Sequence, residues 1–171
     1  MIISAAKLPP LPSKPVKVLF VCLGNICRSP AAEAIMKYAV EERGESADWV
    51  IDSAGTIGYH TGERSDRRMI THARRRGYDL THRARKVTEA DFDDFDLIIG
   101  MDGNNVADLR QLAPTPEHEL KVMAMADFFS TPKRVDYVPD PYYEGAEGFE
   151  LVLDLLDDAV NNLIDTVKAA Q

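Results

Sequence analysis

The chain has 171 residues, 45% of them hydrophobic, and a formal net charge of −8. A chain of this length fits one domain, which buries roughly 70% of the surface that the unfolded chain exposes. The net negative charge argues against a nucleic-acid-binding protein, because contacts with phosphates normally require a basic excess.

Residues 1–14 hold a short apolar segment interrupted by prolines. This pattern differs from the continuous apolar core of a signal peptide, and it predicts a flexible arm before one domain over residues 15–171. No apolar run approaches the roughly 18 residues of a membrane span, so no membrane partner is expected. Two cysteines, Cys22 and Cys27, make no disulfide framework of the secreted kind, and we therefore expect free thiols and a cytoplasmic protein.

Four apolar runs predict β-strands, and helical patterns separate them. The runs cover residues 16–21, 49–52, 96–101 and 121–128. Such alternation is typical of βαβ units, which form a parallel sheet with helices on both faces. The predicted fold class is therefore α/β, as a single doubly wound domain whose ligand crevice lies at the carboxyl ends of the strands.

Glycines mark the ends of the first two helices. One helix is expected over residues 30–43, before Gly44, and the next over residues 66–76, before Gly77. Basic residues gather in and after the second helix, either as a solvated face or as a patch that attracts acidic or phosphorylated partners. They include Arg67, Arg68, Arg74, Arg75, Arg76, Arg83, Arg85 and Lys86.

Further along, Thr88 and Asp91 resemble a capping box, and Asn104 is placed to cap a short helix that reaches Leu112. The end of the chain repeats apolar residues at helical spacing, which predicts one long helix that closes a face of the sheet. The repeated residues are Phe149, Leu153, Leu156, Val160, Leu163, Ile164 and Val167.

The stretch CLGNICRSP, residues 22–30, follows directly on the first predicted strand. Gly24 and Asn25 both tolerate positive φ, and Ser29 with Pro30 has the pattern of an N-cap followed by the first helical residue. A loop this short must curl back on itself. Its backbone N–H groups are therefore expected to converge on one point.

Converging amides, a helix N-terminus and the guanidinium of Arg28 together favour a tetrahedral dianion. The same positive field favours the thiolate form of Cys22, to which the Ser29 hydroxyl can donate a hydrogen bond. The chemistry indicated is covalent attack by Cys22 on a bound phosphate. The predicted phosphate-binding residues are Leu23, Gly24, Asn25, Ile26, Cys27 and Ser29.

Other interpretations of this loop are weaker. The GxxxxGK[ST] motif of nucleotide-binding loops is absent, and two cysteines with no nearby histidine do not suit zinc. Cys27 has two interpretations: a small buried hydrophobic residue, or a thiol that forms a reversible disulfide with Cys22 after oxidation.

The sequence VCLGNICRSP resembles the signature of the low-molecular-weight protein tyrosine phosphatases, and the resemblance covers most of residues 16–169. It implies a four-stranded parallel sheet, no metal and no cofactor. It also implies that phosphotyrosine monoesters are hydrolysed through a cysteinyl phosphate, with Cys22 as nucleophile, Arg28 as transition-state clamp and Ser29 as donor to the thiolate. The expected partners are phosphotyrosine-containing proteins or aryl phosphates, with the protein itself a monomer or weak dimer.

A second segment, DSAGT over residues 52–56, also matches the family, and it implies that Ser53 and His82 support a strained Asn25. The family keeps its general acid in a DP pair, which here is Asp140 followed by Pro141. That proline favours an extended backbone at Asp140, and a nearby thiolate and phosphate would favour a protonated carboxyl.

Three tyrosines are expected to form the walls of the substrate pocket: Tyr59 on one side, and Tyr142 with Tyr143 on the other. Asp66 and Arg68 match a pair in the family that we interpret as structural. His60 has no assignable role, and a histidine at position 72, within a helix, is expected to face solvent.

Three other functions remain for comparison. An arsenate reductase of the same fold needs redox cysteines after Cys27, and the chain has none. A protein-arginine phosphatase of this family typically carries threonine where this chain has Ile26. The third is an inactive phosphate-binding module, which the joint presence of Cys22, Arg28 and Asp140 disfavours.

Overall fold

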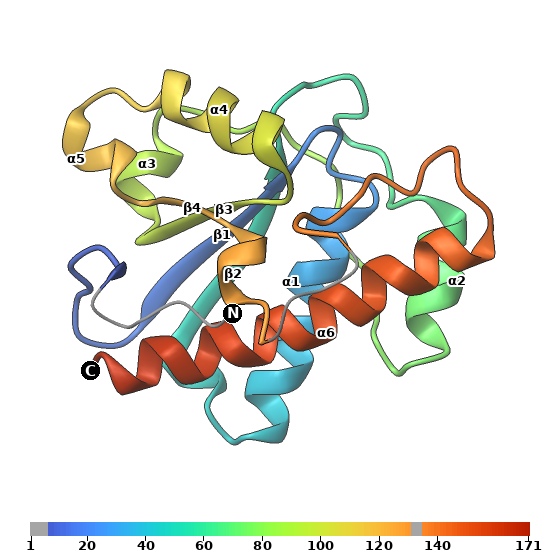
Figure 1. The fold of residues 1–171 in the computed structure, drawn as a ribbon, viewed down its shortest axis with the longest axis horizontal. Coiled ribbons are helices and arrows are strands. Elements are labelled where there is room, and N and C mark those ends of the chain that lie inside the picture. Colours follow the sequence, from blue (N-terminus) through green and yellow to red (C-terminus); the bar gives the residue numbers. More distant parts are fainter. Residues whose placement is uncertain (1–6, 131–134) are drawn as a thin grey trace.

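The structure, a computed structural model, describes residues 7–130 and 135–171. Its centre is a four-stranded parallel sheet in the order β2-β1-β3-β4. Figure 1 shows the strands in the middle of the molecule, with α6 on one side of them and α4 on the other. The strands are β1 Val16–Cys22, β2 Trp49–Gly55, β3 Leu97–Gly100 and β4 Val122–Ala124. This confirms the predicted fold class.

Helices cover both faces of the sheet (Figure 1). They are α1 Arg28–Glu42, α2 Arg67–Arg74, α3 Asp91–Asp94, α4 Gly103–Leu112, α5 Pro116–Glu119 and α6 Ala146–Ala169, with 3₁₀ turns η2 Ser46–Asp48 and η3 Met125–Phe128. Strand β1 is buried on both faces because its side chains alternate between two apolar clusters. Val18 and Phe20 join the cluster with α1 and α6, whereas Leu19 and Val21 join the cluster with Phe92.

The long terminal helix was predicted correctly. All seven residues of its apolar stripe are buried, and α6 packs against α1 on one face of the sheet. Gly44 and Gly77 have φ of +69° and +90°, so each ends its helix in the left-handed conformation that glycine adopts without steric cost. No helix in the described ranges is long and apolar enough to cross a membrane.

Several predicted element ends were wrong: β2 continues to Gly55, three residues past the predicted end, and α2 ends at Arg74, two residues before it. Strand β4 ends at Ala124 rather than at residue 128, because the Asp127 carboxylate accepts the Ala124 N–H at 3.1 Å and the chain turns into η3. The cap of α4 is Asp102, not Asn104. Asp102 accepts the Asn105 N–H at 2.8 Å, and the Asn105 side chain reaches back to complete a capping box.

His72 does not face solvent, which corrects a further prediction. Its ring stacks on Phe149, with centroids 5.5 Å apart and planes 6° apart, and its Nδ1 lies 2.6 Å from a Glu150 carboxylate oxygen. The residue therefore joins α2 to α6. Helix α5, which begins after the side-chain cap of Thr115, was not predicted.

The predicted N-terminal arm falls only partly within the described residues, because residues 1–6 lie outside them. In the remainder, Leu8 and Leu11 are partly buried against the cluster that holds α1 and α6. The Gln171 side-chain amide donates to the Pro12 carbonyl at 3.1 Å. The flexibility of the arm stays a prediction.

Candidate active site

The loop after β1 connects the middle of the sheet to helix α1, at the carboxyl ends of the strands. Cys22 is the last residue of β1 and is buried. Helix α1 begins at Arg28, so Ser29 lies in its first turn and is not the N-cap that we predicted. Pro30 still fits, because residues of the first turn need no intrahelical N–H bond. Instead of capping the helix, the Ser29 hydroxyl lies 3.0 Å from the Cys22 sulfur.

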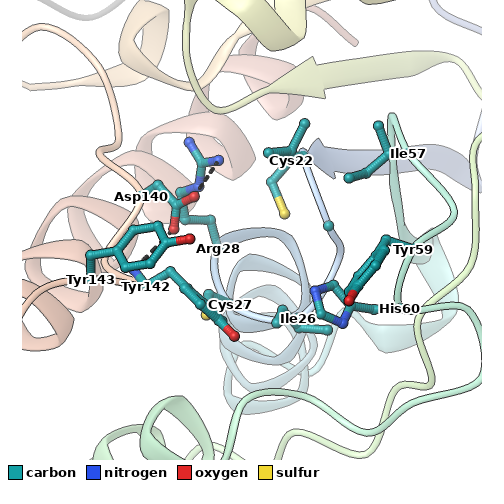
Figure 2. Close-up of a pocket in the computed structure, with 12 residues that line it drawn as sticks. Cys22, Ile26, Cys27, Arg28, Ile57, Tyr59, His60, Asp140, Tyr142 and Tyr143 are labelled. Atoms are coloured by element: carbon teal, nitrogen blue, oxygen red, sulfur yellow. Dashed lines mark hydrogen bonds and ion pairs between the residues drawn. The ribbon is translucent and has the colours of Figure 1, made fainter.

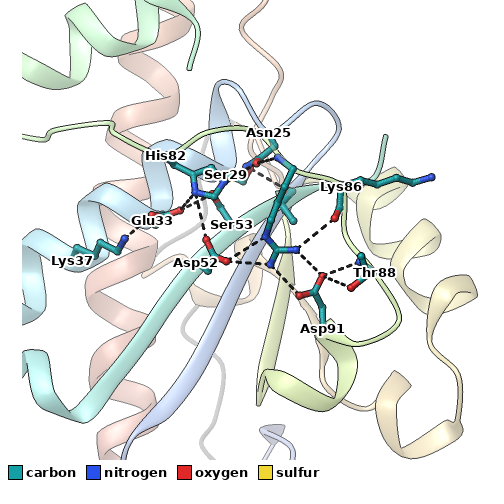
Figure 3. Close-up of polar contacts among 12 residues, drawn as sticks. Asn25, Ser29, Glu33, Lys37, Asp52, Ser53, His82, Lys86, Thr88 and Asp91 are labelled. Atoms are coloured by element: carbon teal, nitrogen blue, oxygen red, sulfur yellow. Dashed lines mark hydrogen bonds and ion pairs between the residues drawn. The ribbon is translucent and has the colours of Figure 1, made fainter. Parts of the chain in front are cut away.

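Asn25 holds the shape of this loop. It has φ of +59° and is the one residue other than glycine with positive φ in the described chain, whereas φ of Gly24, which could also be positive, is not. The Asn25 amide donates to Ser29 Oγ at 2.8 Å and to Ser53 Oγ at 3.0 Å. Its side-chain oxygen Oδ1 accepts His82 Nε2–H at 2.9 Å. The structure therefore brings Ser53 and His82 onto Asn25 as predicted (Figure 3).

A buried carboxylate lies behind these contacts. Glu33 accepts the Ser53 hydroxyl at 2.7 Å, and its Oε1 lies 3.1 Å from His82 Nδ1. Glu33, Asp52 and His82 each present one possible metal ligand within 4.8 Å of the other two. These atoms already form hydrogen bonds or ion pairs with one another, and Figure 3 shows them supporting the loop from behind.

Arg85 extends the same support toward the sheet. Its backbone N–H donates to the Asn25 side-chain oxygen Oδ1 at 3.0 Å, and its guanidinium contacts Asp52 at 3.1 Å and Asp91 at 3.0 Å. Burial lowers the pKa of Arg85, but the hydrogen bonds and charges of the two carboxylates outweigh burial and raise it overall. Arg85 therefore stays charged. Sequence analysis placed it only in a basic cluster.

The loop also needs a glycine on the neighbouring strand. A Cβ on Gly55, at the end of β2, would lie 2.7 Å from the Leu23 carbonyl oxygen. Only a residue without a side chain allows the loop to lie this close to β2. The DSAGT segment therefore contributes its glycine as well as Ser53.

Arg28 is 2% exposed and is held by segments far from it in the sequence. Its Nη1 donates to Asp102 at 2.7 Å and to the Val138 carbonyl at 3.0 Å, while its Nη2 lies 3.9 Å from Asp140. Burial lowers the pKa of Arg28, but Cys22 and Asp102 outweigh burial and raise it overall. Asp102 was not predicted, although its place directly after β3 puts it at the same edge of the sheet.

Asp140 lies in the segment before α6, where its carboxylate accepts the Tyr142 N–H at 3.0 Å. Figure 2 shows this carboxylate next to Arg28, across the pocket from Tyr59. Arg68 contacts this segment at two places. It donates to the Tyr142 carbonyl at 2.9 Å, and its guanidinium lies over the Tyr142 and Phe149 rings. The predicted structural role of Arg68 therefore includes the position of Asp140.

Arg68 also pairs with Asp66, at 3.0 Å. Burial raises the pKa of Asp66, but hydrogen bonds from the Arg68 side chain and backbone outweigh burial and lower it overall. This carboxylate caps α2 and stays ionised. The cap, the arginine and the Asp140 segment form one connected unit.

A pocket of about 360 Å³ joins these groups. Its lining consists of Cys22, Leu23, Gly24, Ile26, Cys27, Arg28, Ile57, Tyr59, His60, Asp140, Tyr142 and Tyr143. Tyr59 is 81% exposed on one side, while Tyr143 is 93% exposed on the other beside Tyr142, as Figure 2 shows. The predicted walls are thus brought together around the pocket.

Two lining residues were missed by the sequence analysis. His60 forms an edge contact with Tyr59, with ring centroids 4.8 Å apart, and its Cδ2 lies where a Cβ on Gly24 would approach to 3.0 Å. Ile57 adds an apolar side chain to the same wall. Both residues lie within five positions of the carboxyl end of β2. Because that end of the sheet carries the ligand crevice, their nearness to it was the signal that could have identified them.

Cys27 is buried, and burial together with the charges of Asp66 and Cys22 raises its pKa. Cys27 is therefore a protonated thiol at neutral pH. Both cysteines are free, and the predicted oxidation to a disulfide stays a prediction. In sum, the pocket holds one cysteine sulfur with a hydroxyl neighbour, a fixed cation and a carboxylate, an arrangement that can bind and attack a tetrahedral anion.

Comparison with known proteins agrees with this geometry. A family model described as low molecular weight phosphotyrosine protein phosphatase matches residues 17–171. A Synechocystis protein named for the same phosphatase family is 48% identical over 153 residues, which cover 89% of this chain and 96% of that protein.

Solved structures give the same result. A protein tyrosine phosphatase of Entamoeba histolytica has a TM-score of 0.87 and 44% identity, with 90% of this chain and 97% of that chain covered. An arginine phosphatase of Drosophila has a TM-score of 0.84 and 33% identity, with coverage of 90% and 97%. The fold described above is therefore shared with solved phosphatases.

Proposed function

The chain belongs to the low-molecular-weight phosphotyrosine protein phosphatase family, and we propose that Cys22, Arg28 and Asp140 perform its reaction, the hydrolysis of phosphotyrosine monoesters through a cysteinyl phosphate. The observation that carries this assignment is that all three residues line one pocket, with the Ser29 hydroxyl 3.0 Å from the Cys22 sulfur. Each residue type suits one part of the reaction.

In the first step, the Cys22 thiolate attacks phosphorus while the bond from phosphorus to the tyrosine oxygen breaks. The Asp140 carboxyl gives its proton to that oxygen, so a neutral phenol leaves. Arg28 and the loop amides stabilise the charge on the equatorial oxygens. The ion pair with Asp102 keeps the Arg28 side chain in place during this step.

In the second step, water attacks phosphorus and the bond from phosphorus to sulfur breaks. The Asp140 carboxylate accepts a proton from that water, so the same group serves as acid and then as base. Inorganic phosphate leaves and the Cys22 thiolate is restored. Besides water, the reaction uses only groups of the protein, and we propose that it needs no metal ion or cofactor. We also propose that the protein acts in the cytoplasm, as a monomer or weak dimer.

The proposed preference for phosphotyrosine rests on the walls of the pocket. Tyr59 and Tyr142 can stack on the ring of the substrate, a contact worth on the order of 1 kcal/mol, and a phosphoserine arm is too short to carry its phosphate past them. An arginine phosphatase is the second candidate, because one of the similar structures is named for that activity. Ile26, an apolar residue of the pocket lining, favours an aryl ester.

One experiment tests these assignments together. Turnover of matched phosphotyrosine, phosphoserine and phosphoarginine peptides is measured without added metal ion, with vanadate as competitor. We expect a large preference for phosphotyrosine in kcat/KM and competitive inhibition by vanadate. Similar kcat/KM for the three peptides would contradict the role of the walls, and absence of both turnover and inhibition would contradict the assignment of the site.

A further inference from the structure

A second groove lies next to the active-site pocket. It has a volume of about 530 Å³, and its lining residues are Glu63, Arg64, Ser65, Arg67, Ile70, Thr71 and Arg74. Residues 67, 70, 71 and 74 share one face of α2, because helix neighbours are three and four positions apart. The opposite face, with Met69 and Ala73, is buried. We call this feature the arginine groove.

The arginines of this groove have no acidic partner among the described residues. Arg64, Arg67 and Arg74 form no ion pair with any residue in 7–130 or 135–171. Arg68 on α2 and Arg76 just after it, by contrast, are paired with Asp66 and Asp157. The one carboxylate in the lining belongs to Glu63, which lies 2.9 Å from His60 Nδ1. The groove therefore carries an excess of positive charge.

Ser65 provides a second, independent observation. The residue is 6% exposed, and its hydroxyl is buried without a hydrogen-bond partner in the part of the chain that the structure describes. Buried hydroxyl groups nearly always have a partner, because an unpaired one is unfavourable. Ser65 also lines the groove, so rotation of its side chain would bring this unpaired hydroxyl to an anion bound beside the guanidinium groups.

The arginine groove and the active-site pocket share a wall. His60 lines the pocket and Glu63 lines the groove, and their side chains are hydrogen-bonded. The two residues are three positions apart, which limits their separation along the chain to about 11 Å at roughly 3.6 Å per residue. A peptide whose phosphotyrosine enters the pocket can therefore place a nearby side chain in the groove.

From these observations we propose that the arginine groove binds a second phosphorylated side chain of the same substrate peptide. The Ser65 hydroxyl donates to one oxygen of that phosphate, and Arg64, Arg67 and Arg74 neutralise its charge. A phosphate suits this set better than a carboxylate because it offers three terminal oxygens and nearly twice the charge. The proposal rests on the proposed function, since it assumes that phosphotyrosine occupies the pocket.

The test uses peptides that contain one phosphotyrosine and differ at a second position. That position, two to five residues away on either side, carries alanine, aspartate or phosphoserine. Phosphoserine is chosen because we do not expect the pocket to hydrolyse it. We expect phosphoserine at one spacing to raise kcat/KM by about 10-fold over alanine at 0.15 M salt, with aspartate in between, since charge-assisted contacts at a partly buried site persist at this ionic strength.

Variants locate the effect. Ser65→Ala, Arg67→Ala and Arg74→Ala should each reduce the preference to about 2-fold or less, while turnover of p-nitrophenyl phosphate stays unchanged. Arg75→Ala is the matched control, because Arg75 is exposed next to Arg74 but does not line the groove. Ser65→Ala should leave the melting temperature of the peptide-free protein unchanged or higher, which separates lost binding from lost folding.

Two results would overturn the proposal: no preference for phosphoserine at any spacing, or an equal loss of preference in Arg75→Ala, which would indicate diffuse charge attraction. Failure to hydrolyse p-nitrophenyl phosphate would instead contradict the proposed function. In that case the groove is tested by fluorescence anisotropy with the labelled peptides, and equal affinity for the alanine and phosphoserine peptides would overturn it as well.

Discussion

The Ser29 hydroxyl beside Cys22 accepts a hydrogen bond from the Asn25 side-chain amide. The side-chain oxygen of Asn25 in turn accepts hydrogen bonds from His82 and from the Arg85 backbone N–H. A chain of contacts therefore fixes the group nearest to the sulfur before any substrate arrives. Such a preorganised donor needs little rearrangement when charge develops on the sulfur. The strained backbone of Asn25 is the cost of this arrangement.

Replacement of the nucleophile separates binding from chemistry. Cys22→Ser should lower turnover of aryl phosphates below about 1% of wild type, because a serine hydroxyl is a far weaker nucleophile at neutral pH. Binding of phosphate or vanadate should persist, because Arg28 and the loop amides remain. Steady-state kinetics and isothermal titration calorimetry measure the two quantities. Residual activity well above this level would argue against a covalent role for Cys22.

Replacement of Asp140 distinguishes leaving groups. Asp140→Ala should slow hydrolysis of phenyl phosphate by roughly 10²-fold or more, because the phenolate then leaves without a proton. Esters with more acidic leaving groups should lose less, and a plot of log kcat/KM, which reports the first step, against leaving-group pKa should become steeper. An unchanged slope would show that Asp140 is not the general acid.

The sequence identified the residues whose local pattern is distinctive. The stretch around Cys22 places an arginine and a helix start at fixed spacing, so the role of Arg28 could be assigned before the fold was known, while the family resemblance implied the strained role of Asn25. Asp102 could not, because it meets Arg28 only when β1 and β3 lie side by side. Its local pattern indicates nothing beyond a helix cap.

At the level of elements, apolar runs predicted all four strands, but they did not predict where β4 ends. KVMAMADF is continuously apolar up to Asp127, and only the hydrogen bond from the Ala124 N–H to that carboxylate turns the chain into η3. Hydrophobicity reports burial, and both β4 and η3 are largely buried. The distinction between strand and turn therefore depended on one side chain.

The link between α2 and the segment of Asp140 gives a prediction at this scale. Arg68→Ala removes the hydrogen bond to the Tyr142 carbonyl and the contacts with two aromatic rings. We expect kcat for phenyl phosphate to fall about 10-fold, and kcat for p-nitrophenyl phosphate to fall less, because Asp140 is then less often in position. Arg67→Ala, one residue away, should leave both values unchanged. An equal loss for the two substrates would assign Arg68 to binding instead.

At the scale of the whole molecule, charged side chains tie α2 to α6. Arg76 contacts Glu150, Asp154 and Asp157 at 2.7 to 2.9 Å, and His72 lies 2.6 Å from Glu150. The hydrogen bond from Arg76, followed by that from His72, lowers the pKa of Glu150 against an opposing effect of burial. Glu150 therefore contributes to the stability of the fold in its ionised form.

The sign of the pH dependence follows from that shift. Because the pKa of Glu150 is lower in the folded protein than its ordinary value of 4.5, the stabilisation is fully present above pH 4.5 and is lost as pH falls through the lower folded value. Glu150→Gln should lower the melting temperature at pH 7 by up to about 3 °C, since an exposed ion pair contributes roughly 1 kcal/mol or less. The difference from wild type should shrink below pH 4.

Glu147→Gln is the matched control for this measurement. Glu147 lies one turn earlier on α6, is exposed, and forms no ion pair with the residues that the structure describes. Its replacement removes the same charge and should leave the melting temperature within about 1 °C of wild type at both pH values. An equal effect of the two substitutions would show that net charge, rather than the contacts of Glu150, sets the pH dependence.

The position of Arg28 has a thermodynamic consequence for the protein as a whole. Its guanidinium donates hydrogen bonds to Asp102 and to the Val138 carbonyl, which lie 74 and 110 residues away in the sequence. An oxyanion that binds Arg28 in the pocket therefore recognises the folded chain and has no comparable site on the unfolded one. Binding and folding become linked equilibria, and an oxyanion at 100 times its dissociation constant adds about 2.7 kcal/mol to the free energy of unfolding. We therefore expect inorganic phosphate, the product of the proposed reaction, to raise the melting temperature of the protein that releases it.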